Sequence, residues 1–169
     1  MKKVLIFDTS IMCVWLQVPG KDTCTTKNNT ITCESINKKI DEEKKNGTTF
    51  ILPIASLIET GNHIAHSAGD KYELGGKFAN LICDTANSTS PWAAFTEQST
   101  LWKPENLVAL ANRWKNSVVA GQSIGDASIV EVAEYYAKLG FEVEIYTGDE
   151  NLKSYQPTSK AQIPRRRKK

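Results

Sequence analysis

The feature that most constrains the fold of this chain is an apolar run at residues 4–7, which ends directly on Asp8, Thr9 and Ser10. A run that is apolar at every position indicates a strand buried on both faces, as in a parallel sheet covered by helices. Ligands of open α/β sheets bind outside the carboxyl ends of the strands. Asp8 is therefore expected to lie at the mouth of a functional site.

The composition predicts a soluble, globular protein. The 169 residues are 40% hydrophobic and 24% charged, which is typical of one folded domain. No apolar run approaches the ~18 residues that a membrane helix needs, and Asp8 interrupts the first apolar stretch before it can form a secretion signal. The sequence thus indicates a cytoplasmic protein without a membrane partner, and its four cysteines are expected to be free thiols.

Two further segments, 49–54 and 141–146, also predict strands, and the second alternates between apolar and polar residues. Helical periodicity predicts helices over residues 34–46, 56–68, 71–86, 105–115 and 123–139. Strands that alternate with helices are typical of a parallel sheet, so the expected fold class is α/β.

Two long segments are expected to be mostly irregular. Residues 17–33 are rich in Pro, Gly, Asn and Thr, and residues 87–104 carry several turn-forming residues. Trp92, Phe95 and Trp102 in the second segment either cover an edge of the core, which is the favoured interpretation, or offer a surface on which bases stack. Residues 1–155 are expected to form the folded domain, and 156–169 a basic tail.

Four carboxylates occupy comparable positions. Asp8 and Asp149 follow predicted strands, while Glu59 and Asp126 are expected in the first turn of predicted helices. Strand ends and helix starts share one edge of a parallel sheet, so the four side chains are expected to converge although about 140 residues separate the first from the last.

Each carboxylate also has a purely local explanation. Glu59 and Asp126 stand three residues after Ser56 and Ser123, which is the spacing of a capping box. Asp8 has the alternative of capping a helix, and Asp149 of being a turn residue beside a glycine.

The position of Asp126 on its predicted helix is evidence against a purely capping role. On a helical wheel it falls in the middle of the apolar arc formed by Ile129, Val130, Ala133, Tyr136 and Ala137. A carboxylate on the core side of a helix must be paired or bound to a cation, and the helix dipole alone supplies only ~0.3–1 kcal/mol. A divalent cation is the economical partner, and oxygen ligands favour Mg²⁺ or Mn²⁺.

Hydroxyl groups flank these acids. Thr9, Ser10 and Thr147 are placed to hydrogen-bond metal ligands, water or substrate. A metal held by several carboxylates orients a phosphodiester and lowers the pKa of a bound water. The constellation therefore predicts phosphodiester hydrolysis.

With these motifs the chain resembles the PIN-domain family. The resemblance rests on a strand ending Phe7-Asp8-Thr9-Ser10, on Glu59 in a middle helix, on Asp126-Ala127-Ser128-Ile129 opening a late helix, and on Tyr146-Thr147-Gly148-Asp149. The order and spacing of the four acids agree over residues 4–149. The segments 17–33 and 87–104 are longer than in a minimal toxin-like member, and the basic tail is extra.

The resemblance implies a three-layer α/β/α fold and a Mg²⁺- or Mn²⁺-dependent ribonuclease. Asp8, Asp126 and Asp149 would hold the metal, Glu59 would complete or orient the catalytic site, and Thr147 is the matching hydroxyl. RNA is the expected substrate, with DNA as an alternative. Many relatives are toxins neutralised by a partner protein, and they commonly form homodimers.

Further residues are candidates for contact with the substrate. His63 lies one turn beyond Glu59, and Asn62 shares that helix face. His63 could contact phosphate or shuttle protons, but as an ordinary surface histidine it needs no role, and that interpretation is favoured. Residues 160–169 carry six basic and no acidic side chains, including Arg165, Arg166 and Arg167. This tail is either an arm that contacts phosphates or a solvated end that aids solubility.

A non-catalytic module of the same fold is the competing hypothesis. In that case the protein binds nucleic acid or a partner, and the four acids have structural roles only. Replacement of Asp126 by Asn separates the two hypotheses, because a catalytic acid affects activity and a structural one affects stability.

Overall fold

The computed structural model describes residues 2–27 and 29–158. Its centre is a parallel sheet of three strands in the order β4-β1-β5, formed by β1 (Lys3–Phe7), β4 (Thr49–Ile51) and β5 (Glu142–Tyr146). Ile6 of β1 stands opposite Ile51 and Ile145. All three strands therefore end at the same edge, and the prediction of a mixed α/β fold with a central parallel sheet is confirmed.

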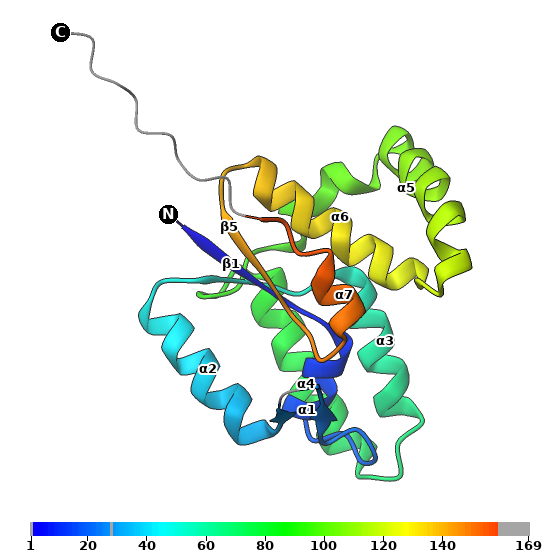
Figure 1. The fold of residues 1–169 in the computed structure, drawn as a ribbon. Coiled ribbons are helices and arrows are strands. Elements are labelled where there is room, and N and C mark those ends of the chain that lie inside the picture. Colours follow the sequence, from blue (N-terminus) through cyan, green and yellow to red (C-terminus); the bar gives the residue numbers. More distant parts are fainter. Residues whose placement is uncertain (1, 28, 159–169) are drawn as a thin grey trace, which may run out of the picture.

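Helices make up most of the remaining structure (Figure 1). They are α1 (Thr9–Trp15), α2 (Cys33–Lys45), α3 (Ile54–Ala65), α4 (Lys71–Ala86), α5 (Pro104–Ser117), α6 (Ile124–Lys138) and α7 (Glu150–Ser154), with the 3₁₀ helices η1 (Phe95–Trp102) and η2 (Val118–Ala120). A short antiparallel hairpin of β2 (Cys24–Thr25) and β3 (Thr30–Ile31) completes the fold.

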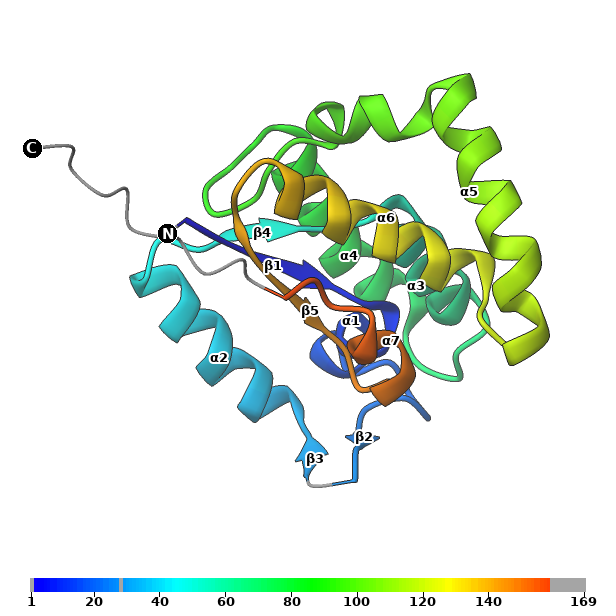
Figure 2. The ribbon, with the colours of Figure 1, turned by 45° about the horizontal axis from the view of Figure 1, so that its top comes forward.

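The sheet separates two apolar cores. Alternate residues of β1 point to opposite faces, so Leu5 and Phe7 join one core while Val4 and Ile6 join the other. The first core is shared with α1, α2 and α4, and the second with α6 and α7. Figures 1 and 2 show α2 on one side of the sheet and α6 on the other, which is consistent with three layers.

The aromatic segment at 87–104 packs against the first core. Trp92 is buried and forms an isolated bridge with Phe50 of β4. The ring of Phe7 lies 5.3 Å from that of Trp92 and 5.2 Å from that of Phe50. The favoured interpretation, that aromatic residues here cover a core edge, is confirmed for Trp92 and for Phe95, which packs on the same cluster.

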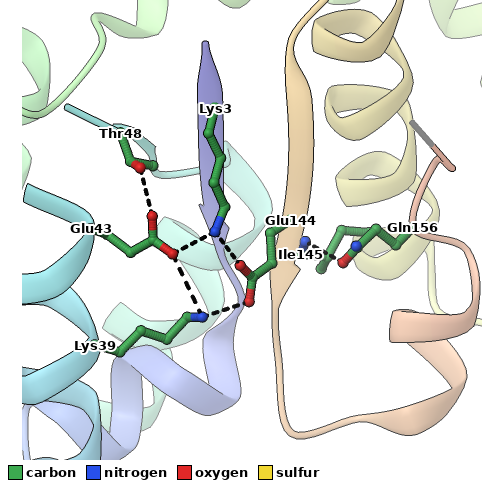
Figure 3. Close-up of polar contacts among 7 residues, drawn as sticks. All are labelled: Lys3, Lys39, Glu43, Thr48, Glu144, Ile145 and Gln156. Atoms are coloured by element: carbon green, nitrogen blue, oxygen red, sulfur yellow. Dashed lines mark hydrogen bonds and ion pairs between the residues drawn. The ribbon is translucent and has the colours of Figure 1, made fainter. Parts of the chain in front are cut away.

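A network of charges attaches α2 to the sheet (Figure 3). Lys3 of β1 pairs with both Glu43 and Glu144, and Lys39 lies 2.8 Å from Glu144. Burial acts to raise the pKa of Glu43 and Glu144, but the hydrogen bonds and positive charges around them outweigh burial and leave both pKa values lowered. Both carboxylates are therefore ionised at neutral pH.

The free edge of β5 is partly covered by the chain that follows α7. The side-chain oxygen of Gln156 accepts a hydrogen bond of 3.0 Å from the backbone nitrogen of Ile145 (Figure 3). A satisfied N–H makes an edge strand a poorer template for pairing with another chain.

The start of α3 differs from the prediction. The strand β4 ends at Ile51, and α3 begins at Ile54 rather than at Ser56. Pro53 precedes the helix with φ −62°, and its fixed φ and missing N–H suit a helix entry. Ser56 is therefore inside the helix and fully buried, and the interpretation of Ser56 and Glu59 as a capping box is wrong.

Two irregular segments contain more regular structure than expected. Residues 17–33 include the β2–β3 hairpin, and residues 87–104 include η1. Hairpin strands of two residues leave almost no periodicity in the sequence, which explains why they were not predicted. Among residues 2–27 and 29–158, no helix is long and apolar enough to cross a membrane.

Candidate active site

Asp8 is the most buried of the four carboxylates. It follows β1 directly and is 6% exposed. Its Oδ2 atom accepts hydrogen bonds from the hydroxyls of Ser10 at 2.7 Å and Thr147 at 2.8 Å, and a longer one from the Ser10 backbone nitrogen. Asp8 therefore caps α1, as its local explanation predicted, and is also tied to a residue 139 positions away.

Two hydroxyls join the ends of β1 and β5. Thr147 Oγ1 donates to Asp8 and accepts a hydrogen bond of 2.9 Å from the backbone nitrogen of Asp149. Ser10 Oγ also donates to Asp8 and accepts a hydrogen bond of 3.0 Å from the backbone nitrogen of Gly148. Each hydroxyl thus holds the buried carboxylate and the segment that carries Asp149 in one arrangement.

Asp149 is exposed at this edge of the sheet. Its Oδ1 atom accepts hydrogen bonds from the backbone nitrogens of Asn151 and Leu152, so it caps the short helix α7. The sequence offered a turn residue beside Gly148 as the local role of Asp149. In the structure its local role is to cap α7.

Glu59 reaches the same site from the second turn of α3. Its Oε2 atom accepts a hydrogen bond of 3.0 Å from Thr9 Oγ1, one residue after Asp8. The carboxylate also lies against Gly125, where a β-carbon would collide with Oε1. The first-turn position predicted for Glu59 is wrong because α3 starts two residues earlier than expected, yet the side chain still lies beside the β1 end.

Asp126 is in the first turn of α6, as predicted, and is half-buried. The backbone nitrogen of Asp126 donates a hydrogen bond of 2.9 Å to Ser123 Oγ. Ser123 therefore caps α6, as the local explanation predicted. Burial raises the pKa of Asp126, and the charges of Asp8 and Asp149 raise it further, while hydrogen bonding with Ser123 opposes the shift. Asp126 is thus close enough to both acids to be affected by their charge.

The donor set suits a hard divalent cation by its chemistry. Four carboxylates approach one sheet edge, and Mg²⁺ and Mn²⁺ prefer such oxygen ligands. In the described parts of the chain, however, no group of three or more His, Cys, Asp or Glu side chains is arranged to hold a metal ion. One oxygen of Asp8 accepts hydrogen bonds from the hydroxyls of Ser10 and Thr147, and one oxygen of Glu59 accepts a hydrogen bond from Thr9.

The predicted substrate-contacting residues have different outcomes. Asn62 is exposed on α3, and His63 is half-buried on the same helix. Burial lowers the pKa of His63, and the charge of Lys21 lowers it further, although Glu59 opposes the shift. His63 is therefore mainly neutral at pH 7. The other predicted substrate contacts, Arg165, Arg166 and Arg167, lie outside the described residues.

Two residues near the site were missed in the sequence. Lys21 is exposed, and its charge affects both His63 and the buried thiol of Cys13, which also responds to Asp8 and Glu59. Cys24 of β2 packs against Gly148, and burial together with the charges of Asp8 and Asp149 raises the pKa of its thiol. Both residues belong to the 17–33 segment, whose position over the site has no periodic signal in the sequence.

Comparison of this chain with protein-family models, with curated proteins and with solved structures found no match. Arguments about function therefore rest on the residues and the geometry of the site.

Proposed function

We propose that this protein is a metal-dependent endoribonuclease with a PIN-like, three-layer α/β/α fold. The observation that supports the proposal is the hydrogen-bonded connection of Asp8 through Thr147 to the Asp149 segment, with Glu59 attached through Thr9 and Asp126 within electrostatic reach. Like charges repel when carboxylates gather at one edge, as the pKa of Asp126 indicates, which burial raises and the charges of Asp8 and Asp149 raise further, so their assembly from distant segments favours a functional role.

Each residue has a proposed task. Asp8, Asp126 and Asp149 would hold Mg²⁺ or Mn²⁺, and the bound ion would supply a water of lowered pKa and neutralise charge on the phosphodiester. Ser10 and Thr147 fix the orientation of Asp8, because both of their hydroxyls donate to the same carboxylate oxygen. Glu59 orients the site from the α3 side through Thr9. Hydrolysis would leave 5′-phosphate and 3′-hydroxyl ends.

The test is cleavage of a mixed pool of single-stranded and structured RNA with Mg²⁺, Mn²⁺ or a chelator. The key variant is Asp126→Asn, and the matched control is Asp41→Asn, because Asp41 is an exposed carboxylate on α2. We expect metal-dependent cleavage that is lost in Asp126→Asn and retained in Asp41→Asn. Cleavage that persists in Asp126→Asn, or in chelator, contradicts the proposal.

A non-catalytic, PIN-like binding module is the second candidate. The observation that favours it is that Asp8 and Asp149 both cap helices, so these acids have structural tasks without any reaction. Under this hypothesis Asp126→Asn changes the melting temperature, no cleavage occurs with either metal, and no ion binds to the purified protein.

A further inference from the structure

An apolar groove beside the candidate active site lies beneath α5. It has a volume of about 520 Å³ and is lined by residues of α3, α5 and α6 together with Trp102 at the end of η1. Figure 2 shows α5 on the outside of the molecule, with α6 between it and the sheet. No residue of α5 is buried in the described structure, so its inner face borders open space. We call this space the α5 groove.

The walls of the α5 groove are aromatic and aliphatic. Trp102 and Trp114 line it, together with Ile58, Leu107 and Ile124, which are 54%, 42% and 47% exposed. Trp114 Nε1 already donates a hydrogen bond of 2.9 Å to the backbone oxygen of Gln122. The only polar atom of that indole is therefore occupied, and the rest of its ring is apolar surface.

Two polar side chains in the wall of the α5 groove, those of Glu59 and Ser128, offer hydrogen-bond acceptors, and the indole nitrogen of Trp102 is a donor. Ser128 Oγ uses its hydrogen to donate to the Gly125 backbone oxygen at 2.7 Å, and the carboxylate of Glu59 forms the other polar wall. Glu59 also accepts the hydrogen bond from Thr9, which follows Asp8. The α5 groove and the four acids therefore share one side chain, and a ligand in the groove is next to the candidate active site.

We propose that the α5 groove binds one base of the nucleic-acid strand whose phosphodiester lies at the four acids. This inference rests on the proposed function and extends it to recognition of the substrate. A base has a flat apolar face that stacks on an indole, and such stacking contributes ~1–3 kcal/mol per base. Because Glu59 and Ser128 offer acceptors, bases with an exocyclic amino group, such as adenine or cytosine, are preferred over uracil.

The test uses nucleosides, which carry no phosphate and so do not require the metal site. The protein has four tryptophans, and their indole N–H signals are separate probes in a nitrogen–proton correlation spectrum. We expect adenosine and cytidine to shift the signals of Trp102 and Trp114, assigned by Trp→Phe variants. The signals of Trp15 and Trp92, which pack with the first core, should stay in place. Ribose alone should have no effect.

Matched variants locate the binding site on one face of α5. Ala111 lines the α5 groove and is exposed, so Ala111→Phe fills the space without overpacking a core. Ala109 is exposed on the same helix outside the groove lining, and Ala109→Phe is the control. We expect Ala111→Phe to abolish the nucleoside shifts and to raise the KM for RNA at least tenfold, while Ala109→Phe changes neither.

Three results would overturn the base site. The first is no shift of the Trp102 and Trp114 signals with any nucleoside, and the second is nucleoside shifts in Ala111→Phe equal to those of the wild type. The third is shifts of the same two indole signals that depend on protein concentration alone, which would assign the α5 groove to a second copy of the chain. The two proposals fail separately: shifts without RNA cleavage by the wild type reject the nuclease, and cleavage without shifts rejects the base site.

Discussion

The carboxylate of Glu59 lies in the space that a side chain at position 125 would occupy. A β-carbon on Gly125 would overlap Glu59 Oε1, although the two residues belong to different helices, α3 and α6. Gly125 is in the first turn of α6, directly before Asp126. The absence of a side chain at one residue therefore determines where an acid 66 positions earlier can lie.

The first prediction is that Gly125→Ala separates activity from stability. The colliding atom is the end of a flexible side chain, so Glu59 can move, and alanine favours a helix by roughly 1 kcal/mol over glycine. We expect an unchanged or slightly raised melting temperature and about a 10²-fold loss of RNA cleavage, because small displacements of catalytic groups are costly. Gly76→Ala in α4 is the control, since a β-carbon there meets no neighbour; an active Gly125→Ala variant would exclude a role for the position of Glu59.

The second prediction concerns the hydroxyl of Thr147. Thr147→Val keeps the shape but removes the donor to Asp8 and the acceptor for the Asp149 nitrogen, and we expect a loss of about 1–3 kcal/mol in the free energy of unfolding. Cleavage should fall as well, because Asp8 loses one of two hydroxyl partners. Urea denaturation of Thr147→Ser provides the comparison: it retains the hydroxyl and should stay close to wild type. Equal damage in both variants would assign the effect to packing.

The third prediction is a pH-dependent contribution of Glu144 to stability. Its pKa is below the ordinary value of 4.5 because Lys3 and Lys39 outweigh the opposing effect of burial. A carboxylate whose pKa is lower in the folded than in the unfolded protein stabilises the fold when the pH is above its unfolded-state pKa. That contribution is lost as the pH falls through the folded-state pKa. Glu144→Gln should therefore cost about 1–2 kcal/mol at pH 7, and the difference from wild type should shrink below about pH 4.5.

Glu73→Gln is the control for the charge network. Glu73 pairs with Lys77 on α4, and both side chains are more than half exposed. An exposed pair of this kind contributes only about 0.3–0.5 kcal/mol. Thermal unfolding between pH 3 and 8 measures both variants, and a Glu144→Gln curve parallel to that of wild type would contradict the prediction.

The fourth prediction tests the contact between the β2–β3 hairpin and the site. A β-carbon on Gly148 would overlap the sulfur of Cys24, so Gly148→Ala should push the hairpin away from the strand ends. Hydrogen exchange of residues 22–27 should become severalfold faster, and adding Cys24→Gly should restore the wild-type rate. An exchange rate that does not change in Gly148→Ala would show that the hairpin adapts without moving.

Periodicity predicted the elements whose physical origin is local or strongly apolar. The buried run at 4–7, the alternation at 141–146 and the capping serine at 123 all correspond to elements of the structure. The predicted start of α3 was two residues too late because Ser56 resembles a capping residue. In the structure Pro53, with its fixed φ, precedes the helix. Ser56 shows that a capping pattern in the sequence cannot distinguish the residue before a helix from a buried residue in its first turn.

The sequence by itself determined that the carboxyl ends of parallel strands would carry acids and hydroxyls, because strand burial and the shared edge of a parallel sheet follow from local patterns. Only the tertiary structure decided which groups meet. Thr147 contacts Asp8 across 139 positions of sequence, Glu59 contacts Gly125 across 66, and Cys24 contacts Gly148 across 124. Such contacts depend on the packing of side chains from separate elements, and a packing arrangement has no period in the sequence.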